Sequence, residues 1–230
     1  MSDYFNNYLK AIDNPLEDSK KAFDDELNLF KKYVSKLPIN SQIIDIGCGI
    51  ARPLDKICKI YSNYNFIGID NNKKMIKEAK NRLHKLDNVN IIFKDIFNKD
   101  LDKDMFNLTY STYNLIGSIN NSKRNDLIKE KCRITKDNGY IITITWKTDN
   151  YTTEFLKKYY PYININIIKN NSLKTITDKG KFERVSVEEI KNLYTKNNID
   201  IIEIKNIGKI WIAVVGRVKK QNLKVLKTGK

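Results

Sequence analysis

The chain has 230 residues, of which 41% are hydrophobic and 30% are charged, and it carries a formal net charge of +15. This length suits one α/β domain with a full core and is short for two domains. Because the sequence contains neither a run of about 18 apolar residues nor a signal peptide, we expect a soluble, cytoplasmic protein with no membrane partner.

The first part of the chain predicts two helices. Apolar side chains recur at helical spacing at Phe23, Leu27 and Phe30, and the pair Asn14 and Pro15 separates this pattern from an earlier one. We expect residues 1–40 to form a helical cover on the rest of the domain.

Strands and helices then alternate along the chain. The patterns predict strands at 42–46, 65–70, 89–93, 106–111 and 140–146, and helices at 50–61, 72–86 and 122–134. A turn at 137–139 precedes the last of these strands. Helical segments of this length between strands imply crossover connections and therefore a parallel sheet.

The alternation stops after Trp146. Residues 147–185 form an insert much longer than a usual connection, and two short apolar runs within it, at 163–168 and 173–177, flank KNNS and predict a hairpin. A helix at 187–196 and strands at 199–204 and 210–218 follow. Because Gly208 leaves room for only a short turn, the last strand should be antiparallel to its neighbour. We expect a single domain over residues 1–218, with the insert as a lid over a substrate site.

Positive charge is concentrated at the end of the chain. Residues 204–230 carry eight of the 15 excess positive charges and no acid, and we expect residues 219–230 to be a flexible basic tail. Lysine greatly outnumbers arginine, whereas planar recognition of phosphates and bases favours arginine. We therefore interpret the charge mainly as a solvated surface, with nucleic acid as a weakly supported alternative partner.

Three acids stand at or just after the ends of the first three predicted strands. They are Asp45, Asp70 and Asp95, and the carboxyl ends of parallel strands line one crevice, so we expect the three carboxylates to converge there. Gly47 and Gly49 would let the backbone approach a ligand closely. Asp70 follows Gly49 by 21 residues, the position at which an acid can bind both ribose hydroxyls of a nucleoside.

The segments DIGCG, FIGID, NVNIIFKDIF and NGYIITIT resemble, in order and spacing, four motifs of class I S-adenosylmethionine-dependent methyltransferases. The resemblance covers residues 42–146. It implies an α/β three-layer sandwich with a mostly parallel seven-stranded sheet and an antiparallel last strand. It also implies S-adenosyl-L-methionine as cofactor and S-adenosyl-L-homocysteine as product.

A nicotinamide dinucleotide is the alternative ligand for this glycine turn. Its fingerprint needs a third glycine at position 52, where this chain has Arg52, which would obstruct close packing of helix against strand. Methyltransferases often carry a third glycine two residues after the second, and Ala51 occupies that place.

The resemblance assigns roles at the methionine end of the cofactor. Gly47, Cys48 and Gly49 would form the turn against the methionine part, and Asp45 would support that turn. The alternative for Asp45 is a purely structural role as a cap or brace. Cys48 also fits the turn simply as a small buried side chain.

The resemblance also assigns roles at the nucleoside end. Asp70 would bind the ribose hydroxyls, and Asn71 and Met75 would flank the adenine. Asp95 and Ile96 would receive the adenine amino group. Asp95, like Asp45, has the alternative of bracing a turn.

The segment LTYSTYNLIGSIN resembles the stretch of small-molecule methyltransferases that lies beside the reactive methyl group, and it differs from the NPPY-type motif of enzymes that methylate base or amide nitrogens. By this match Ser111 would border the cofactor, and Tyr113 and Asn114 would be catalytic residues that position the acceptor. The alternative for Tyr113 is ordinary core packing.

Other side chains are candidates to cover the substrate. They are Tyr4 and Tyr8 of the N-terminal segment and Trp146 beside the insert. A sulfonium is already an activated methyl donor, so alignment and desolvation matter more than a strong catalytic base.

The cysteines and the histidine point to no other chemistry. Cys48, Cys58 and Cys132 include no CxxC pair, and His84 has no second histidine with which to share a metal, so we expect neither a disulfide framework nor a metal site.

The leading hypothesis is a methyltransferase that acts on a small molecule by direct in-line displacement. One alternative is an RNA or tRNA methyltransferase that uses the basic tail to bind phosphates. Another is a non-catalytic, S-adenosylmethionine-binding subunit of a complex. The sequence leaves the acceptor atom and the oligomeric state open.

Overall fold

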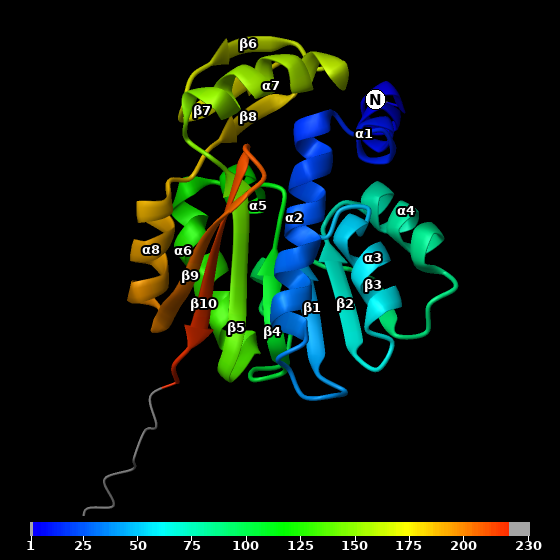
Figure 1. Ribbon diagram of the computed structural model, residues 1–230, viewed down its shortest axis with the longest axis vertical. Helices are drawn as coiled ribbons and strands as arrows, with labels where there is room; N and C mark the ends of the chain where they lie inside the picture. Colours follow the sequence, from blue (N-terminus) through cyan, green and yellow to red (C-terminus); the bar gives the residue numbers. More distant parts are fainter. Residues whose placement is uncertain (1, 221–230) are drawn as a thin grey trace, which may run out of the picture.

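The computed structural model describes residues 2–220, with side chains from residue 5 onward (Figure 1). Most of the predicted basic tail, residues 221–230, lies outside this range. The helices are α1 (Ser2–Asp13), α2 (Glu17–Val34), α3 (Arg52–Ile60), α4 (Lys73–Leu83), α5 (Leu115–Ser118), α6 (Asn121–Ile134), α7 (Asn150–Tyr162) and α8 (Val187–Lys196), together with the 3₁₀ turn η1 (Ile96–Asn98). The strands are β1 (Gln42–Ile46), β2 (Asn65–Asp70), β3 (Val89–Phe93), β4 (Phe106–Ser111), β5 (Thr135–Trp146), β6 (Ile167–Asn170), β7 (Lys174–Thr177), β8 (Gly180–Glu183), β9 (Ile199–Ile207) and β10 (Trp211–Val218).

Within the described residues the main sheet has seven strands in the order β3-β2-β1-β4-β5-β10-β9. Strands β1 to β5 pair in parallel, and β10 runs antiparallel to both β5 and β9. The predicted antiparallel last strand is therefore confirmed. The strand order reverses between β1 and β4, and ligands of open α/β sheets bind outside the carboxyl ends of the strands at such a switch point.

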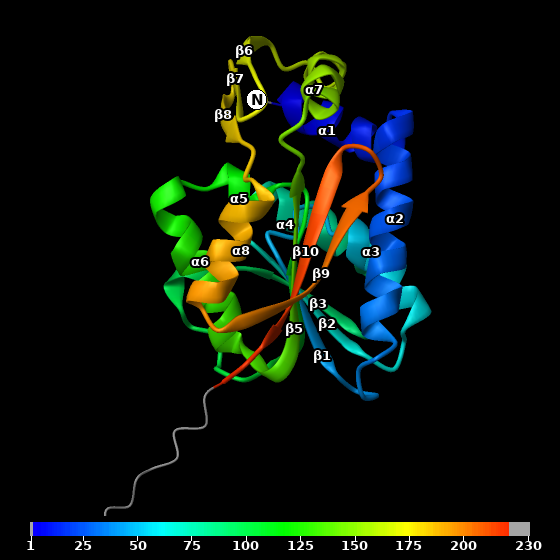
Figure 2. The same cartoon turned by 60° about the vertical axis from the view of Figure 1, so that its left-hand side comes forward.

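Helices cover both faces of the sheet, so the predicted three-layer sandwich is also confirmed (Figure 2). One face packs against α2, α3 and α4, where Phe30 and Tyr110 meet with ring centroids 4.4 Å apart. The other face packs against α6 and α8, with Phe106 and Ile128 fully buried. In the part of the chain that the structure describes, no helix is long and apolar enough to cross a membrane.

A further layer lies above the carboxyl ends of the strands. It contains α1, α7 and the small sheet β6-β7-β8 (Figures 1 and 2). The hairpin predicted around KNNS is present as β6 and β7, but helix α7 and strand β8 were not predicted. Asp149 caps α7 by accepting a hydrogen bond from the Thr152 amide at 2.8 Å. Residues 147–185 are thus ordered around one helix.

Predicted and observed boundaries differ near β5 and β9. Strand β5 begins before the predicted turn at 137–139, since Thr135 already pairs with Phe106 of β4. The turn therefore lies inside β5 as a bulge, where Asn138 has a φ of +60°. Strand β9 continues to Ile207 rather than ending at residue 204. The strands at 42–46, 65–70, 89–93 and 106–111 begin and end where predicted.

Lys131 on α6 is fully buried beneath β4 and β5. Its amine donates hydrogen bonds to Ser111 Oγ at 3.0 Å, to the Ile142 carbonyl at 2.9 Å and to Thr143 Oγ1 at 3.0 Å. The Tyr194 hydroxyl donates to the same Thr143 oxygen at 2.8 Å. Burial disfavours the charged amine and lowers the pKa of Lys131 to about 7. This cluster joins α6, α8 and the centre of the sheet through polar contacts.

We expect Lys131→Met to remove a pH dependence of stability. The pKa of Lys131 lies below that of an unfolded lysine, so between about pH 7 and pH 10 the unfolded chain binds a proton that the folded chain has released. The stability of the wild type should therefore rise with pH relative to the variant, by at most about 1.4 kcal/mol per pH unit. Urea unfolding of both proteins across this range measures the difference, with Lys129→Met, at an exposed position of α6, as control. A difference that stays constant with pH would contradict the expectation.

Candidate active site

The turn between β1 and α3 is attached to the end of β2 through three consecutive backbone amides. Those of Gly47 and Cys48 donate to the Ile69 carbonyl at 2.8 and 2.9 Å, and that of Gly49 donates to Asp70 Oδ2 at 3.0 Å. Gly47 and Gly49 have φ values of +70° and +54°, which glycine adopts at little cost. The turn therefore needs its two glycines for backbone geometry.

The turn continues into α3 through Ala51 and Arg52, whose side chains restrict the backbone more than glycine would. Ala51 takes a φ of +61°, so this alanine adopts the left-handed conformation that a third glycine would favour. Arg52 points to α2, where its Nη2 lies 2.6 Å from Glu26 Oε2 and its guanidinium carbon lies 3.9 Å from the centre of the Phe23 ring. Arg52 thus joins α3 to α2, and no pattern in the sequence indicates its buried partner Glu26.

Asp45 is a buried acid directly before the turn. It is 1% exposed, and neither of its carboxylate oxygens accepts a hydrogen bond within the described residues. Burial raises the pKa of Asp45 well above its usual value, and the nearby Glu26 raises it further, while Arg52 opposes the shift. The structure therefore shows no hydrogen bond from Asp45 to the turn, and it leaves the carboxylate in need of a donor or a cation.

Asp70 stands at the end of β2, half-buried beside the turn. Its Oδ2 accepts from the Gly49 amide, and its Oδ1 accepts from the Asn72 amide at 2.8 Å. Burial raises the pKa of Asp70, and these two hydrogen bonds oppose the shift. Each carboxylate oxygen keeps a second lone pair, so a ligand with two hydroxyl groups can bind there without displacing the turn.

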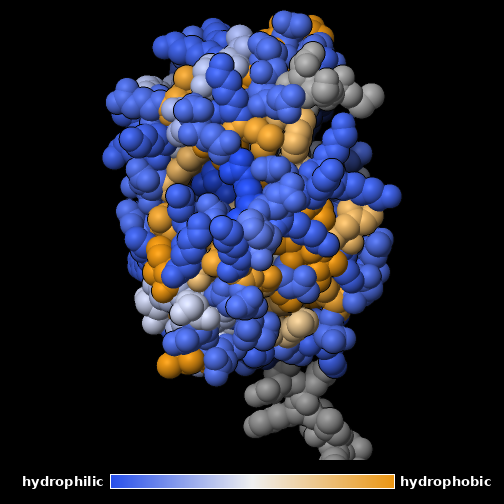
Figure 3. Space-filling model, turned by 90° about the vertical axis from the view of Figure 1, so that its right-hand side faces the viewer, coloured by the Kyte–Doolittle hydropathy of each residue, from blue (hydrophilic) through white to orange (hydrophobic). Residues whose placement is uncertain are grey.

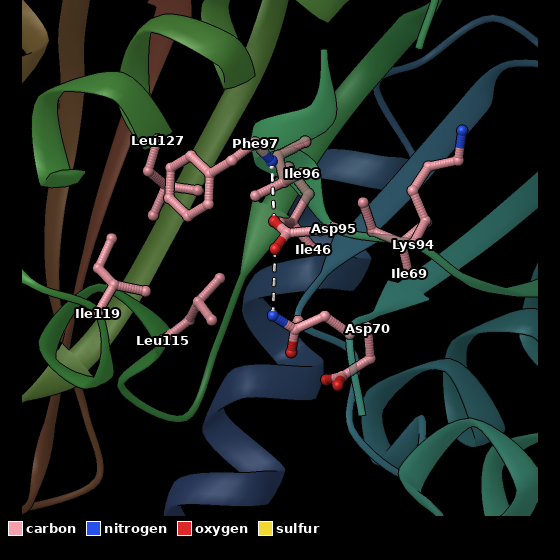
Figure 4. A pocket seen from close by; sticks show the side chains of 12 residues that line it. Ile46, Ile69, Asp70, Lys94, Asp95, Ile96, Phe97, Leu115, Ile119 and Leu127 are labelled. Carbon is pink, nitrogen blue, oxygen red and sulfur yellow. Dashed lines mark hydrogen bonds between the residues drawn. The ribbon is translucent and has the colours of Figure 1, made fainter. Parts of the chain in front are cut away.

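A cavity opens beside Asp70 at the ends of β1, β2 and β3, with an empty volume of about 400 Å³, and we call it the strand-end cavity. Figure 4 shows Asp70 and Asp95 on one side of it and the apolar side chains of Phe97, Leu115 and Leu127 on the other. The surface in Figure 3 is hollowed in its upper half, with hydrophilic side chains in the hollow and apolar ones beside it. An apolar wall opposite two carboxylates suits a flat base that carries a sugar.

Asp95 has a structural role in addition to its place in this wall. Its carboxylate accepts from the Phe97 amide at 2.9 Å, which caps η1, and from Asn71 Nδ2 at 3.4 Å. Asn71 and Ile96 also line the cavity, and their contact with an adenine stays a prediction. Met75 is not among the lining residues; it lies half-buried on α4.

A second cavity lies under the upper layer, with an empty volume of about 510 Å³, and we call it the aromatic cavity. Its lining residues come from α1, the loop after β4, the end of β5 and the insert, and they are Tyr8, Tyr113, Asn114, Ser118, Trp146, Tyr159, Tyr160, Ile163, Ile165 and Phe182. The predicted cover residues Tyr8 and Trp146 therefore both lie here, whereas the side chain of Tyr4 is outside the described part of the structure.

The loop after β4 enters this cavity through a strained turn. Tyr113 and Asn114 have φ values of +52° and +67°, a conformation that costs energy for residues with side chains and often marks functional sites. Asn114 donates from Nδ2 to the Glu183 carbonyl at 2.9 Å, and its Oδ1 accepts from Thr145 Oγ1 at 2.5 Å. The Tyr113 hydroxyl shares a hydrogen bond with that of Tyr159. The strained turn is therefore held from β5, β8 and α7.

Two predicted cofactor residues, Ser111 and Cys48, line neither cavity. Ser111 is 1% exposed, and its hydroxyl accepts from Lys131 on the α6 side of the sheet. The Cys48 thiol packs in the core on the α3 side, and burial raises its pKa well above the usual value. The Ser111 side chain lies on the same α6 side of the sheet as the strand-end cavity but lines neither cavity, and its place beside the cofactor stays a prediction.

The fold and the two cavities define the class of protein. A sheet with its switch point at a glycine turn, and an acid at the end of the next strand, is the arrangement of Rossmann-like nucleoside-binding enzymes. The methyltransferase domain family model matches residues 39–177, more than half of the chain, and the chain belongs to this family. It is an S-adenosylmethionine-dependent methyltransferase.

Two curated relatives are similar over much of the sequence. Carboxy-S-adenosyl-L-methionine synthase of Campylobacter fetus is 29% identical over 160 residues, which are 67% of this chain and 67% of that protein. Malonyl-(acyl-carrier protein) O-methyltransferase 2 of Ilyobacter polytropus is 27% identical over 213 residues, which are 86% of this chain and 80% of that protein.

Solved structures share the fold at lower identity. A SAM-dependent methyltransferase from Aquifex aeolicus superimposes with a TM-score of 0.67 at 18% identity, over 92% of this chain and 97% of that one. Geranyl diphosphate C-methyltransferase from Streptomyces coelicolor, solved with S-adenosyl-L-homocysteine, gives 0.60 at 12% identity, over 84% and 78%.

We expect Gly47→Ala to destabilise the protein more than Gly49→Ala does. Both glycines have positive φ, but a Cβ on Gly47 would lie 2.7 Å from Leu115 Cδ1, whereas the nearest atom to a Cβ on Gly49 is the Tyr8 hydroxyl at 3.7 Å. The difference in the free energy of unfolding should be roughly 1 kcal/mol and is measured by urea denaturation. Adding Leu115→Ala to each variant should remove that difference, and equal losses in the two single variants would show that steric overlap does not matter.

Proposed function

We propose that the protein transfers a methyl group from S-adenosyl-L-methionine to a small-molecule acceptor bound in the aromatic cavity. The observation that carries this proposal is the adjacency of the two cavities. Leu115 lines the strand-end cavity, and the preceding Asn114 lines the aromatic cavity. The hydroxyl of Tyr8, which lines the aromatic cavity, also lies 3.7 Å from the point where a Cβ added to Gly49 would stand. A ligand beside the turn would therefore reach the edge of the aromatic cavity.

The residues around the turn fit the cofactor. Asp70, with lone pairs left on both oxygens, would hold the ribose hydroxyls, and Asp95 with Ile96 would meet the adenine. Asp45 has a buried carboxylate without a partner, which suits the ammonium group of the methionine part. The bound cofactor supplies a methyl group activated on a sulfonium.

The chain's own residues would bind and orient the acceptor and exclude water from it. Trp146, Tyr159 and Tyr160 are each at most 5% exposed, so the walls of the cavity are almost dry. Alignment of the two reactants and removal of water are the contributions that a transfer from an activated donor needs most. Enclosure of this kind supports a small acceptor rather than a polymer.

The relatives support a small acceptor by what their names say of them. One is a malonyl-(acyl-carrier protein) O-methyltransferase, another a sterol 24-C-methyltransferase, and a structural neighbour methylates geranyl diphosphate. The chain spans a third of the length of the sterol enzyme. Because these acceptors differ from one another, the acceptor of this protein has to be inferred from its own cavity.

We expect Asp70→Ala to weaken S-adenosyl-L-methionine binding by roughly 2 kcal/mol, or about 30-fold, through loss of charge-assisted hydrogen bonds to the ribose. Isothermal titration calorimetry measures the affinity, and thermal melting checks the fold. Asp87→Ala is the matched control, since Asp87 is exposed and lies at the opposite end of the sheet. Equal affinity of wild type and Asp70→Ala would reject this assignment of Asp70.

The acceptor class can be tested with the isolated protein. We expect S-adenosyl-L-homocysteine to form when the enzyme and its methyl donor are mixed with the low-molecular-mass fraction of a cell extract. Total RNA from the same extract should give no product, because the walls of the aromatic cavity are almost completely buried. Product formation from RNA alone would contradict a small-molecule acceptor.

A further inference from the structure

The walls of the aromatic cavity are set at steep angles to one another. The planes of Tyr8 and Tyr113 meet at 89°, those of Tyr113 and Trp146 at 63°, and those of Tyr159 and Tyr160 at 69°. Neighbouring rings therefore meet edge to face rather than in one stack, and all of them line the aromatic cavity. Phe182, stacked on Tyr160 at 29°, extends one wall.

The described residues that line this cavity include no charged side chain and no histidine. The amide of Asn114 is already bonded to Glu183 and Thr145, and burial raises the pKa of the Tyr113 phenol, so it remains protonated at neutral pH. Such walls offer no base for an alcohol or a carbon acid, each of which must lose a proton to react. They suit an amine, which can release its proton to water before it binds and then react as a neutral free base through its lone pair.

Rings that surround a space are also the arrangement that binds a positive charge. A cation near the faces of tryptophan and tyrosine is attracted by the ring quadrupoles, and the attraction is strongest where water is excluded. We infer that the acceptor is an amine, whose nitrogen is held among Trp146, Tyr113 and Tyr160 and becomes more positive as it is methylated. This inference rests on the proposed function, because it names the substrate class of the same cavity.

The transfer to nitrogen balances without a further reactant. The amine lone pair forms the new N–C bond, the C–S bond breaks, and its electron pair remains on sulfur. Positive charge passes from sulfur to nitrogen, inside the walls that stabilise it. A secondary amine then releases its N–H proton to water, whereas a tertiary amine becomes a quaternary ammonium and keeps its charge. Preferential stabilisation of the charged nitrogen favours the transition state over the neutral amine.

Two arginines lie near the walls without lining the cavity. Arg52 is paired with Glu26, and its charge is further opposed by the buried Asp45. Arg184 is 4% exposed, interacts electrostatically with Tyr160 and Asp149, and donates from Nη2 to Asn170 Oδ1 at 3.2 Å. If the charge of Arg184 governed the cavity, an anion would bind there in preference to a cation. A comparison of the cavity's affinities for a cation and for an anion therefore tests the inference.

The experiment compares three probes that share one shape. They are choline, its neutral analogue with carbon in place of nitrogen, and the carboxylate of tert-butylacetic acid. Each is titrated calorimetrically into the full-length protein saturated with S-adenosyl-L-homocysteine. We expect choline to bind about 10-fold more tightly than the neutral analogue, and the carboxylate to bind most weakly. Choline binding that is absent, or no tighter than that of either analogue, would overturn the inference.

Variants test whether the aromatic rings cause the preference for choline over its neutral analogue. Trp146→Leu and Tyr160→Leu should each reduce the ratio of choline to neutral-analogue affinity several-fold. Tyr160→Phe, which keeps the ring, should retain the ratio, and Ile163→Val, in the same wall, should leave it unchanged. An unchanged ratio in a variant that melts like the wild type and has lost its ring would also count against the cage.

Titration with S-adenosyl-L-homocysteine distinguishes failure of the amine inference from failure of the proposed function. Saturation with S-adenosyl-L-homocysteine, followed by no preference for choline, would reject the amine and leave the methyltransferase reaction untouched. Failure to bind S-adenosyl-L-homocysteine at all would reject the cofactor assignment itself. In that case the probes, titrated without it, would still report the charge preference of the cavity.

Discussion

The hydrogen bonds between the glycine turn and the end of β2 determine the geometry on which the rest of the site depends. Gly47 and Cys48 donate to the Ile69 carbonyl, and Gly49 donates to Asp70. These bonds require positive φ in the turn, and they fix the Asp70 carboxylate beside the backbone that approaches the ligand. The pairing of β1 with β2 thereby places a carboxylate beside the turn, where we propose that the nucleoside binds.

The upper layer adds the aromatic cavity beside this turn. Helix α1 and the insert place Tyr8, Tyr159 and Phe182 opposite the strained turn after β4, which carries Tyr113. In the proposed function the sheet would hold the donor, and segments outside the sheet would surround the acceptor. Since the second group of segments can change without disturbing the sheet, related chains can methylate chemically different acceptors on one fold.

Sequence patterns predicted the sheet and the strand-end cavity better than the aromatic cavity. The β-branched runs in the sequence predict the ends of β2 and β3 correctly. The strand-end cavity is therefore lined by residues that the sequence places at those ends, Asp70, Asn71 and Asp95. Helix α7 was missed although Asp149 supplies an N-cap and Phe155, Leu156, Tyr159 and Tyr160 recur at helical spacing. Its threonines and tyrosines favour strands, and only the packing of those four side chains on the domain decides for a helix.

What the sequence determined by itself is local: strand ends, the turn that needs Gly47 and Gly49, and the acids that follow the strands. What only the tertiary structure decided is which distant side chains meet. The Asp45 carboxylate is buried without a hydrogen-bond partner in the described residues, Arg52 pairs with Glu26, and the Ser111 hydroxyl accepts from Lys131. Backbone conformation depends on neighbours along the chain, whereas burial and pairing depend on how crossovers and inserts pack, which no short segment encodes.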